Sequence, residues 1–254
     1  MSAGMTDVAS GALLISDRDG VRTLTLNRPE RRNALNTDLS RSLLAALRNA
    51  DADPAVNAVL LTGNGPVFCA GADLGEFKGA TDPAPSILRS EILCEMQIAF
   101  GQLAVPVVCA LHGAALGFGA ALVNLSDMAV MGEGARLGYP ELQHGMVPSL
   151  MLPVIQHAVS GKKSFELLAM AQPIGAAEAL ALGLVNAVVP NEAVAERALQ
   201  MATALAKVDR DALRETKLMS AVMANMSLAD AMRYGRDASA RRAAANQANQ
   251  AKKH

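Results

Sequence analysis

The sequence predicts an α/β fold followed by a helical region, and two observations support this prediction. Short β-rich runs such as NAVLLT and PVVCAL alternate with helical patterns up to about residue 190. Strands that alternate with helices indicate parallel strands joined by right-handed crossovers. From Pro190 onward the pattern is helical throughout. We therefore expect an α/β core over residues 1–190 and a C-terminal helical region over residues 191–254.

The first predicted elements are a hairpin and a helix. The β-rich runs ALLISD and VRTLTLN flank a glycine-containing turn at residues 18–20. A helix is expected to begin near Asn36 or Thr37, because either residue can cap its first turn. Its apolar face is marked by leucines at helical spacing: Leu39, Leu43, Leu44 and Leu47.

A loop and a long helix are expected after the buried strand NAVLLT. The stretch GNGPVFCAGADLGEF predicts a glycine-rich loop ahead of a short helix, with Asp73 in the first turn of that helix. A second long helix is predicted over residues 83–103. The face expected to be buried consists of Leu88, Ile92, Met96, Ala99, Phe100 and Leu103.

The remaining elements of the core also alternate. The strand PVVCAL is followed by the helix LGFGAALVNL, and two short strands, DMAVM and ARLGYP, flank the turn GEG. After Glu141 we expect three helical stretches and a last strand, LVNAVV.

The composition excludes several classes of function. A formal net charge of −1 provides no field that would attract nucleic acid or an anionic membrane. No apolar run approaches the ~18 residues of a membrane span, and the N-terminus lacks the pattern of a signal peptide. Three cysteines without CxxC spacing are typical of a reducing compartment. We therefore expect a cytoplasmic protein without nucleic-acid or membrane partners.

Common metal and nucleotide motifs are missing from the sequence. It contains neither HExxH nor a Cys/His group with zinc spacing, so no metal site is expected. It also lacks a GxSxG elbow and a P-loop. The run GFGAAL begins like a dinucleotide fingerprint, but Leu122 occupies the position of the third glycine.

Two junctions rich in glycine and alanine, VFCAGADL and AALGFGAAL, are candidates for a binding site. The first N–H groups of a helix are unpaired, and small residues let a ligand approach them. Two such junctions side by side would direct two N–H donors at one oxygen, which is an oxyanion hole. The alternative is that these small residues only permit tight packing of strand against helix.

Glu141 is the candidate acid–base residue. It follows Pro140 in RLGYPELQHG and precedes the apolar run GMVPSLML. Apolar walls raise the pKa of a carboxyl group toward values useful to a general base. The alternative is a loop carboxylate in a surface ion pair. His144 is a candidate partner, although it and His112 are more simply explained as hydrogen-bonded structural residues.

Four blocks together resemble the enoyl-CoA hydratase/isomerase (crotonase) superfamily. They are NRPERRNALN at 27–36, FCAGADL at 68–74, HGAALGFGAAL at 112–122 and YPELQHGMVPS at 139–149. The resemblance implies a crotonase-like spiral of ββα units with a C-terminal α-helical oligomerisation region, forming a homotrimer or a dimer of trimers. It also implies an acyl-CoA thioester substrate and no separate cofactor, because coenzyme A is part of the substrate.

The same resemblance implies which residues form the site. The oxyanion donors would be the backbone N–H groups of Ala72 and Phe118, although Phe118 stands where the family usually has glycine. Gly75 replaces a lysine found in many members, and Lys217 is a candidate ligand of a CoA phosphate. The residues expected to line the CoA and acyl path are Arg28, Arg32, Ala34, Ala70, Asp73, Leu74, Leu116 and Gly117.

The carboxylates distinguish between the family's reactions. Hydratases of this family hold a water molecule between two glutamates. Glu141 matches the second of these, but the first falls on Ala121. The resemblance therefore favours Δ3–Δ2 double-bond isomerisation, in which one glutamate moves the proton. The alternatives are a hydratase of branched or unusual enoyl-CoAs that works with Glu141 alone or with His144, and an acyl-CoA-binding protein with weak turnover.

Overall fold

The computed structural model describes residues 11–76, 78–79 and 81–251. Its centre is a six-stranded sheet in the order β1-β2-β3-β4-β6-β9. The predicted hairpin is present as the antiparallel pair β1/β2, and every other neighbouring pair in this sheet is parallel. The strands are β1 (Leu13–Arg18), β2 (Val21–Leu26), β3 (Ala58–Gly63), β4 (Val107–Leu111), β6 (Met128–Gly132) and β9 (Ala187–Val189).

A second, smaller sheet has the order β5-β7-β8. Its strands are β5 (Ala114–Leu116), β7 (Arg136–Gly138) and β8 (Ile174–Gly175). The runs DMAVM and ARLGYP are strands as predicted, but they are β6 and β7 and belong to different sheets. The sequence did not predict β5 and β8, because strands of two or three residues carry no periodic signal.

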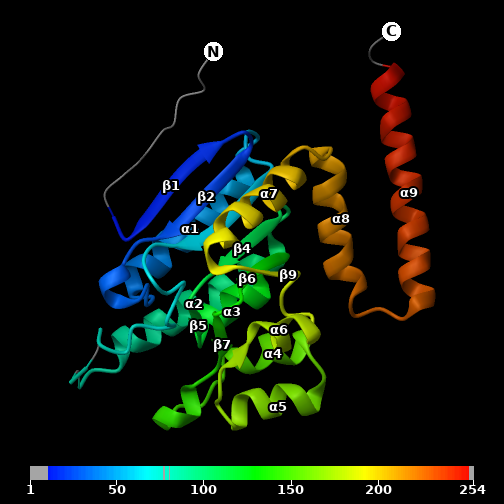
Figure 1. Ribbon diagram of the computed structural model, residues 1–254. Helices are drawn as coiled ribbons and strands as arrows, with labels where there is room; N and C mark the ends of the chain where they lie inside the picture. Colours follow the sequence, from blue (N-terminus) through cyan, green and yellow to red (C-terminus); the bar gives the residue numbers. More distant parts are fainter. Residues whose placement is uncertain (1–10, 77, 80, 252–254) are drawn as a thin grey trace.

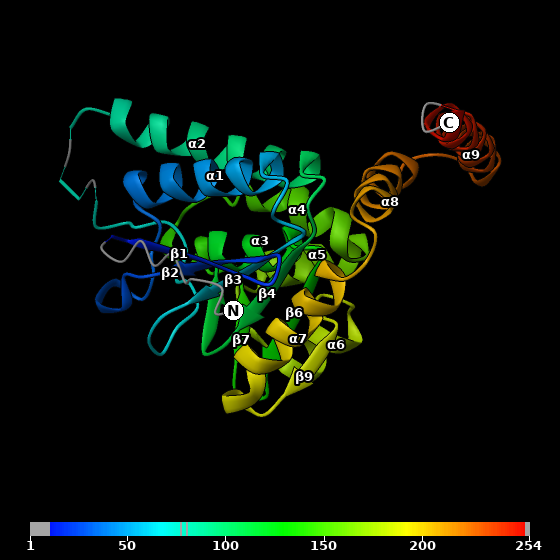
Figure 2. The same ribbon diagram turned by 90° about the horizontal axis from the view of Figure 1, so that it is seen from above.

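The first helix, α1 (Thr37–Ala52), covers one face of the large sheet, and α2 (Ala84–Gln102) packs against α1 on the same side (Figure 2). The predicted cap is confirmed, because the Asn36 side chain accepts a hydrogen bond from Leu39 N at 3.0 Å. The four leucines of α1 are buried, as predicted. On α2 the expected face is also buried, except that Leu88 is 41% exposed.

The opposite face of the sheet is covered by α7 (Val194–Ala206) (Figure 2). Small residues at every fourth position of α7, Val194, Ala198, Ala202 and Ala206, are buried against this face. Because α7 follows Pro190, a helix of the region 191–254 is part of the packing of the core.

The segment between β7 and β9 forms a helical layer at the bottom of the view in Figure 1. Its helices are short: η2 (Glu141–His144), α4 (Met151–Ala158), α5 (Gly161–Ala169) and α6 (Ala176–Ala181). Two further 3₁₀ turns, η1 (Pro29–Arg31) and η3 (Asn191–Ala193), precede α1 and α7. The α3 helix (Phe118–Leu125) lies within the core and begins directly after β5.

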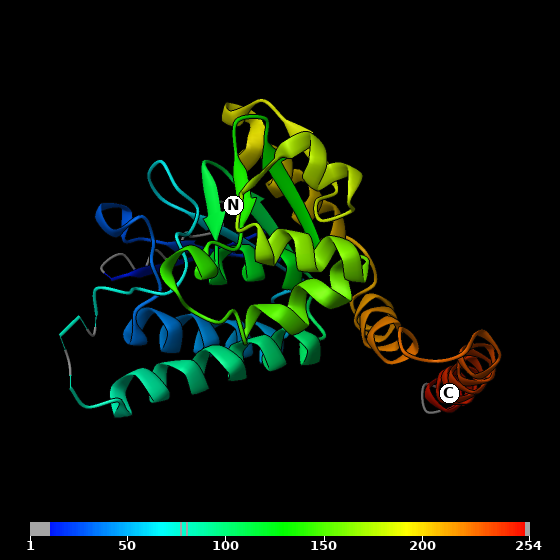
Figure 3. The same ribbon diagram turned by 90° about the horizontal axis from the view of Figure 1, so that it is seen from below.

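The last two helices, α8 (Arg210–Met223) and α9 (Leu228–Ala251), project away from the sheets (Figure 1, Figure 3). Ion pairs attach α8 to the core. Arg214 contacts Asp51 at 2.9 Å, and Lys217 contacts Asp127 at 2.7 Å. The Lys217 side chain also donates to Val105 O at 2.9 Å. The nitrogen of Lys217 is therefore engaged in docking α8.

Throughout the described residues, no helix combines the length and apolarity needed to cross a membrane. The spiral of ββα units with a C-terminal helical region is confirmed by the solved structures compared below.

Candidate active site

Three segments far apart in the sequence form one hydrogen-bonded platform. The loop after β3 pairs with β5, because Cys69 N donates to Ala114 O at 3.1 Å and Leu116 N donates to Cys69 O at 3.0 Å. Gly117 N in turn donates to Gly138 O of β7 at 2.9 Å. The platform therefore fixes the backbone around residues 69–72, 114–118 and 138–141 relative to one another.

Two glycines bring the predicted N–H donors together. A Cβ atom on Gly71 would lie 2.7 Å from Leu116 O and 3.4 Å from Phe118 N, and Gly71 has a φ of +94°. Such close approach requires glycine and places the backbone before Ala72 against the start of α3. Within the part of the chain that the structure describes, the Ala72 and Phe118 amides donate no hydrogen bond. They are available to an oxygen of a bound molecule.

The loop that carries Ala72 is held by its neighbours rather than by a helix. Leu35 N donates to Gly71 O at 2.8 Å, and Asp73 N donates to Leu35 O at 2.9 Å. The prediction of a helix beginning at Asp73 is wrong, because residues 74–76 form a turn. The Asp73 carboxylate instead accepts from Gly75 N at 3.1 Å and from Arg28 at 3.0 Å.

Glu141 is the first residue of η2 and follows β7 after a two-residue connection. A Cβ atom on Gly117 would lie 2.7 Å from Glu141 Oε1, so the carboxylate lies directly against the backbone that precedes Phe118. Its other oxygen, Oε2, is buried, and among the described residues it has no hydrogen-bond partner. An unpaired buried oxygen is a ready proton acceptor.

The environment raises the pKa of Glu141 above the ordinary value for a glutamate. Burial is the main cause, because it disfavours the charged form. A hydrogen bond from the residue's own backbone N–H and the nearby charge of His144 oppose this shift. The result agrees with the apolar walls predicted from the sequence.

A cavity of about 860 Å³, which we call the first cavity, joins these parts. Its size is within the range of ~300–1,000 Å³ typical of small-molecule sites. The sequence-predicted residues that line it are Arg32, Ala34, Ala70, Ala72, Asp73, Leu74, Leu116, Gly117, Phe118 and Glu141. His144 also lines it.

Several predicted residues have other roles. Arg28 does not line the first cavity, and its guanidinium donates to Ala34 O at 2.5 Å and to Asp73. Lys217 contacts Asp127 instead of the cavity. His112 lies 3.0 Å from Gly65 O through its Nε2 atom, in agreement with a structural role.

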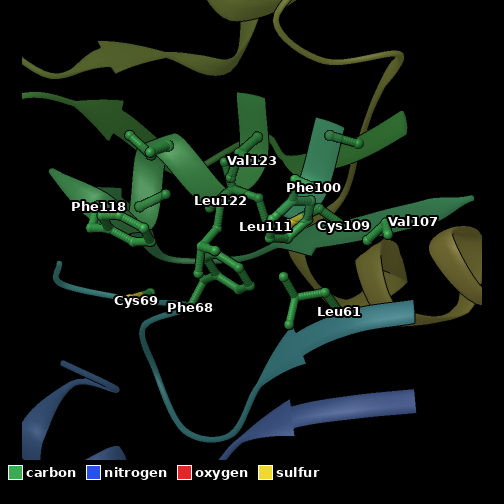
Figure 4. Close-up of a cluster of buried hydrophobic side chains, with 14 of the residues drawn as sticks. Leu61, Phe68, Cys69, Phe100, Val107, Cys109, Leu111, Phe118, Leu122 and Val123 are labelled. Carbon is green, nitrogen blue, oxygen red and sulfur yellow. The ribbon is translucent and has the colours of Figure 1, made fainter. Parts of the chain in front are cut away.

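Position 121 supplies no second acid. Ala121 is fully buried in the hydrophobic core and does not line the first cavity. The Phe118 ring also lies in this core, with 2% of the residue exposed, near Phe68 and Leu122 (Figure 4). The substitution of Phe118 for glycine thus places the side chain in the core and leaves its backbone N–H in the cavity wall.

Arg89 is a site residue that sequence reasoning missed. It lines the first cavity and donates from Nη1 to Asp73 O at 2.6 Å. Its position on α2 resembled any exposed helix position, so only the fold brings it to the loop.

No group of three or more His, Cys, Asp or Glu side chains suited to a metal ion occurs among the described residues. The site therefore consists of two amide donors, one carboxylate and a large cavity.

Comparisons with known proteins give a consistent result. Residues 16–253 match the family model for enoyl-CoA hydratase/isomerase. A Thermus thermophilus protein provisionally named an enoyl-CoA hydratase is 38% identical over 220 residues, covering 85% of this chain and 87% of that protein. The Escherichia coli 2,3-dehydroadipyl-CoA hydratase is 35% identical over 81% of this chain and 80% of its own length. The crystal structure of an enoyl-CoA hydratase from Mycobacterium smegmatis superposes with a TM-score of 0.86 at 29% identity, covering 91% and 90% of the two chains.

Proposed function

Because the chain belongs to the enoyl-CoA hydratase/isomerase family, we propose that it moves the double bond of a 3-enoyl-CoA thioester to the 2-position, with Glu141 as the only proton carrier. The observation that supports this best is the set of acids in the first cavity. Of the three described carboxylates that line it, Asp73 is paired with Arg28, and Glu30 lies on the exposed η1 turn. Only Glu141 lies against the amide donors.

The proposed reaction begins with the thioester. Its carbonyl oxygen accepts hydrogen bonds from the Ala72 and Phe118 amides, and the Glu141 carboxylate removes a proton from C2. The electrons of the C2–H bond become part of a dienolate, whose negative oxygen is stabilised by the two amides. The carboxyl group of Glu141 then returns the proton to C4. Removal of one oxyanion donor typically costs about 3 kcal/mol, so the amides matter as much as the acid.

The raised pKa of Glu141 suits both halves of this reaction. A base whose pKa approaches the working pH accepts a proton more readily, and its conjugate acid still returns the proton. The unpartnered Oε2 supports the same role, because a carboxylate oxygen in a fixed ion pair would not be free to accept a proton.

Hydration is the second candidate, since the relatives above carry the name hydratase. It requires Glu141 to activate a water molecule alone or with His144, which also lines the first cavity. Ala121 weighs against hydration, because its methyl group can neither bind the water molecule nor act as a second acid or base. A weakly active acyl-CoA-binding protein is the third candidate, and the unpaired Oε2 of Glu141 weighs against it.

We also propose that coenzyme A is part of the substrate and that no separate cofactor is needed. The chain is further proposed to form a homotrimer or a dimer of trimers. The exposed apolar residues of the two projecting helices support an oligomer: Leu218, Val222, Leu228 and Met232.

The test is a time course with a 3-enoyl-CoA, followed through the ultraviolet absorbance of the conjugated 2-enoyl thioester. We expect conjugation with the wild type and a loss of about 10²–10⁴-fold in Glu141→Gln, the usual range for removal of an acid–base group. Chromatography checks the products. Accumulation of 3-hydroxyacyl-CoA would contradict isomerisation and support hydration, and no conversion of any enoyl-CoA would support the binding protein.

A further inference from the structure

A second cavity of about 540 Å³ lies between α2, α3 and α4. Its volume is within the usual range for small-molecule sites. The residues that line it are Cys94, Gln97, Ile98, Asn124, Leu125, Leu150, Pro153, Val154, His157 and Ala158. Six of these ten residues are aliphatic, the polar ones are Gln97, Asn124 and His157, and none is a carboxylate, a lysine or an arginine. The walls therefore match an uncharged hydrocarbon group.

The second cavity continues the first along the same helix. Ser90 and Leu93 of α2 line the first cavity, and Cys94 and Gln97, on the next turn, line the second. Leu150, the residue before α4, lines both. A chain that starts at the amide donors and runs past Leu93 thus meets Leu150 and then the second cavity.

A single side-chain hydrogen bond lies at the boundary between the cavities. Gln97 Nε2 donates to Leu150 O at 2.9 Å and links α2 to the start of α4. The chain just before α4 is open to solvent, and Val147 there is 79% exposed. Both partners are only partly buried, so water can replace the bond when it opens.

We propose that the second cavity binds the far end of a long acyl chain and that the Gln97–Leu150 hydrogen bond is the gate that the chain displaces. This inference rests on the proposed function, because it takes the thioester to be held by the amides of the first cavity. The driving force is burial of methylene groups. Each contributes about fourfold in affinity, which corresponds to about 0.8 kcal/mol. The site thereby prefers long acyl chains to short ones.

The test compares the dissociation constants of butanoyl-CoA and decanoyl-CoA by calorimetry. Both are saturated, so neither requires turnover. Val154→Phe fills the second cavity from α4. We expect this variant to weaken the binding of decanoyl-CoA by at least about 10-fold and that of butanoyl-CoA by less than about twofold, because a few buried methylene contacts are lost. Gln97→Ala removes the gate, and we expect it to strengthen the binding of decanoyl-CoA without changing that of butanoyl-CoA.

A matched control lies on the same helix. Leu152→Phe adds the same ring on α4 at a residue that is 39% exposed and lines neither cavity. It should leave both constants unchanged. If Val154→Phe does not fold, Ile98→Phe fills the same cavity from α2, where Ile98 is 55% exposed.

Two results would overturn the inference. Equal weakening of both thioesters, or of neither, would show that the acyl chain does not reach the second cavity. A changed sedimentation coefficient with unchanged dissociation constants would assign this face to a contact between copies of the chain.

If Val154→Phe loses the tighter binding of decanoyl-CoA, the inference is supported even where no enoyl-CoA is converted. In that case only the proposed reaction fails.

Discussion

The two halves of the candidate site are built in opposite ways. Around the Ala72 and Phe118 amides, neighbouring backbone groups form a continuous set of hydrogen bonds that includes Gly71 O, Asp73 N and Gly117 N. Glu141 stands on a 3₁₀ turn whose residue Leu142 is 44% exposed, and the buried oxygen Oε2 has no partner in the described chain. The two amide donors are fixed by the backbone, whereas the Glu141 carboxylate is left free to titrate.

Gly117→Ala tests both halves at once, and among the comparisons that follow it has the largest expected effect on activity. The residue has a φ of +54°, and an added Cβ would lie 2.7 Å from Glu141 Oε1. The carboxylate, the Phe118 amide or both must move, so we expect kcat/KM to fall by about 10²–10³-fold, as for loss of an oxyanion donor. Steady-state kinetics measures the change.

The control for that variant is Gly101→Ala, because a Cβ at Gly101 in α2 meets no atom within 4 Å. It should keep full activity and add about 0.5–1 kcal/mol of stability, the usual gain for alanine within a helix. Equal activity of the two variants would show that the backbone at residue 117 does not position the site.

The pH dependence tests the carboxylate half alone. The raised pKa of Glu141 means that the base is lost by protonation at a higher pH than for an ordinary glutamate, whose pKa is about 4.3. We expect the acidic limb of the kcat/KM profile to lie above that value. In His144→Gln the limb should move further up, because the charge that opposes the shift is removed. An unchanged limb would mean that His144 does not act on Glu141.

Stability should respond with the matching sign. A carboxyl group whose pKa is raised by folding contributes stability that is present below its unfolded pKa and lost as the pH rises through the folded pKa. Glu141→Gln should therefore gain stability relative to the wild type at neutral pH and lose that advantage in acid. Urea unfolding at a series of pH values measures the difference, and a constant difference would contradict the pKa shift.

Lys217→Met tests a residue outside the first cavity and has the smallest expected effect on activity. Its ion pair with Asp127 leaves only 13% and 29% of the two side chains exposed. We expect a loss of about 1–2 kcal/mol in stability with unchanged kcat/KM. Arg233→Met removes a pair that is 67% and 62% exposed, and it should change neither quantity. A loss of activity in Lys217→Met would indicate contact with the substrate after all.

The sequence predicted the parts of this site that depend on local pattern. The glycine spacing around residues 71 and 117 indicated two donors, and the apolar run after Glu141 indicated a raised pKa. It failed where distant side chains compete. Asp73 pairs with Arg28, 45 residues away, rather than starting a helix, and Lys217 pairs with Asp127, 90 residues away. Pairings between residues so far apart leave no trace in local spacing.

The larger architecture shows the same division. The β1/β2 hairpin and α1 were predicted, because alternation and a leucine stripe extend over six or more residues. The small sheet was missed, because β5 and β8 are too short to show a period. Yet β5 supplies the backbone that joins the loop of Ala72 to the start of α3. A strand that the sequence did not predict therefore positions the two glycine-rich junctions that it did predict.

The burial of the Phe118 ring has an evolutionary consequence. A donor that belongs to the main chain is encoded by no particular codon, and any amino acid except proline preserves it. A replacement of Phe118 therefore changes the packing of the core, whereas the amide in the cavity wall persists. The role proposed for Glu141 has no such redundancy, because it depends on a side chain.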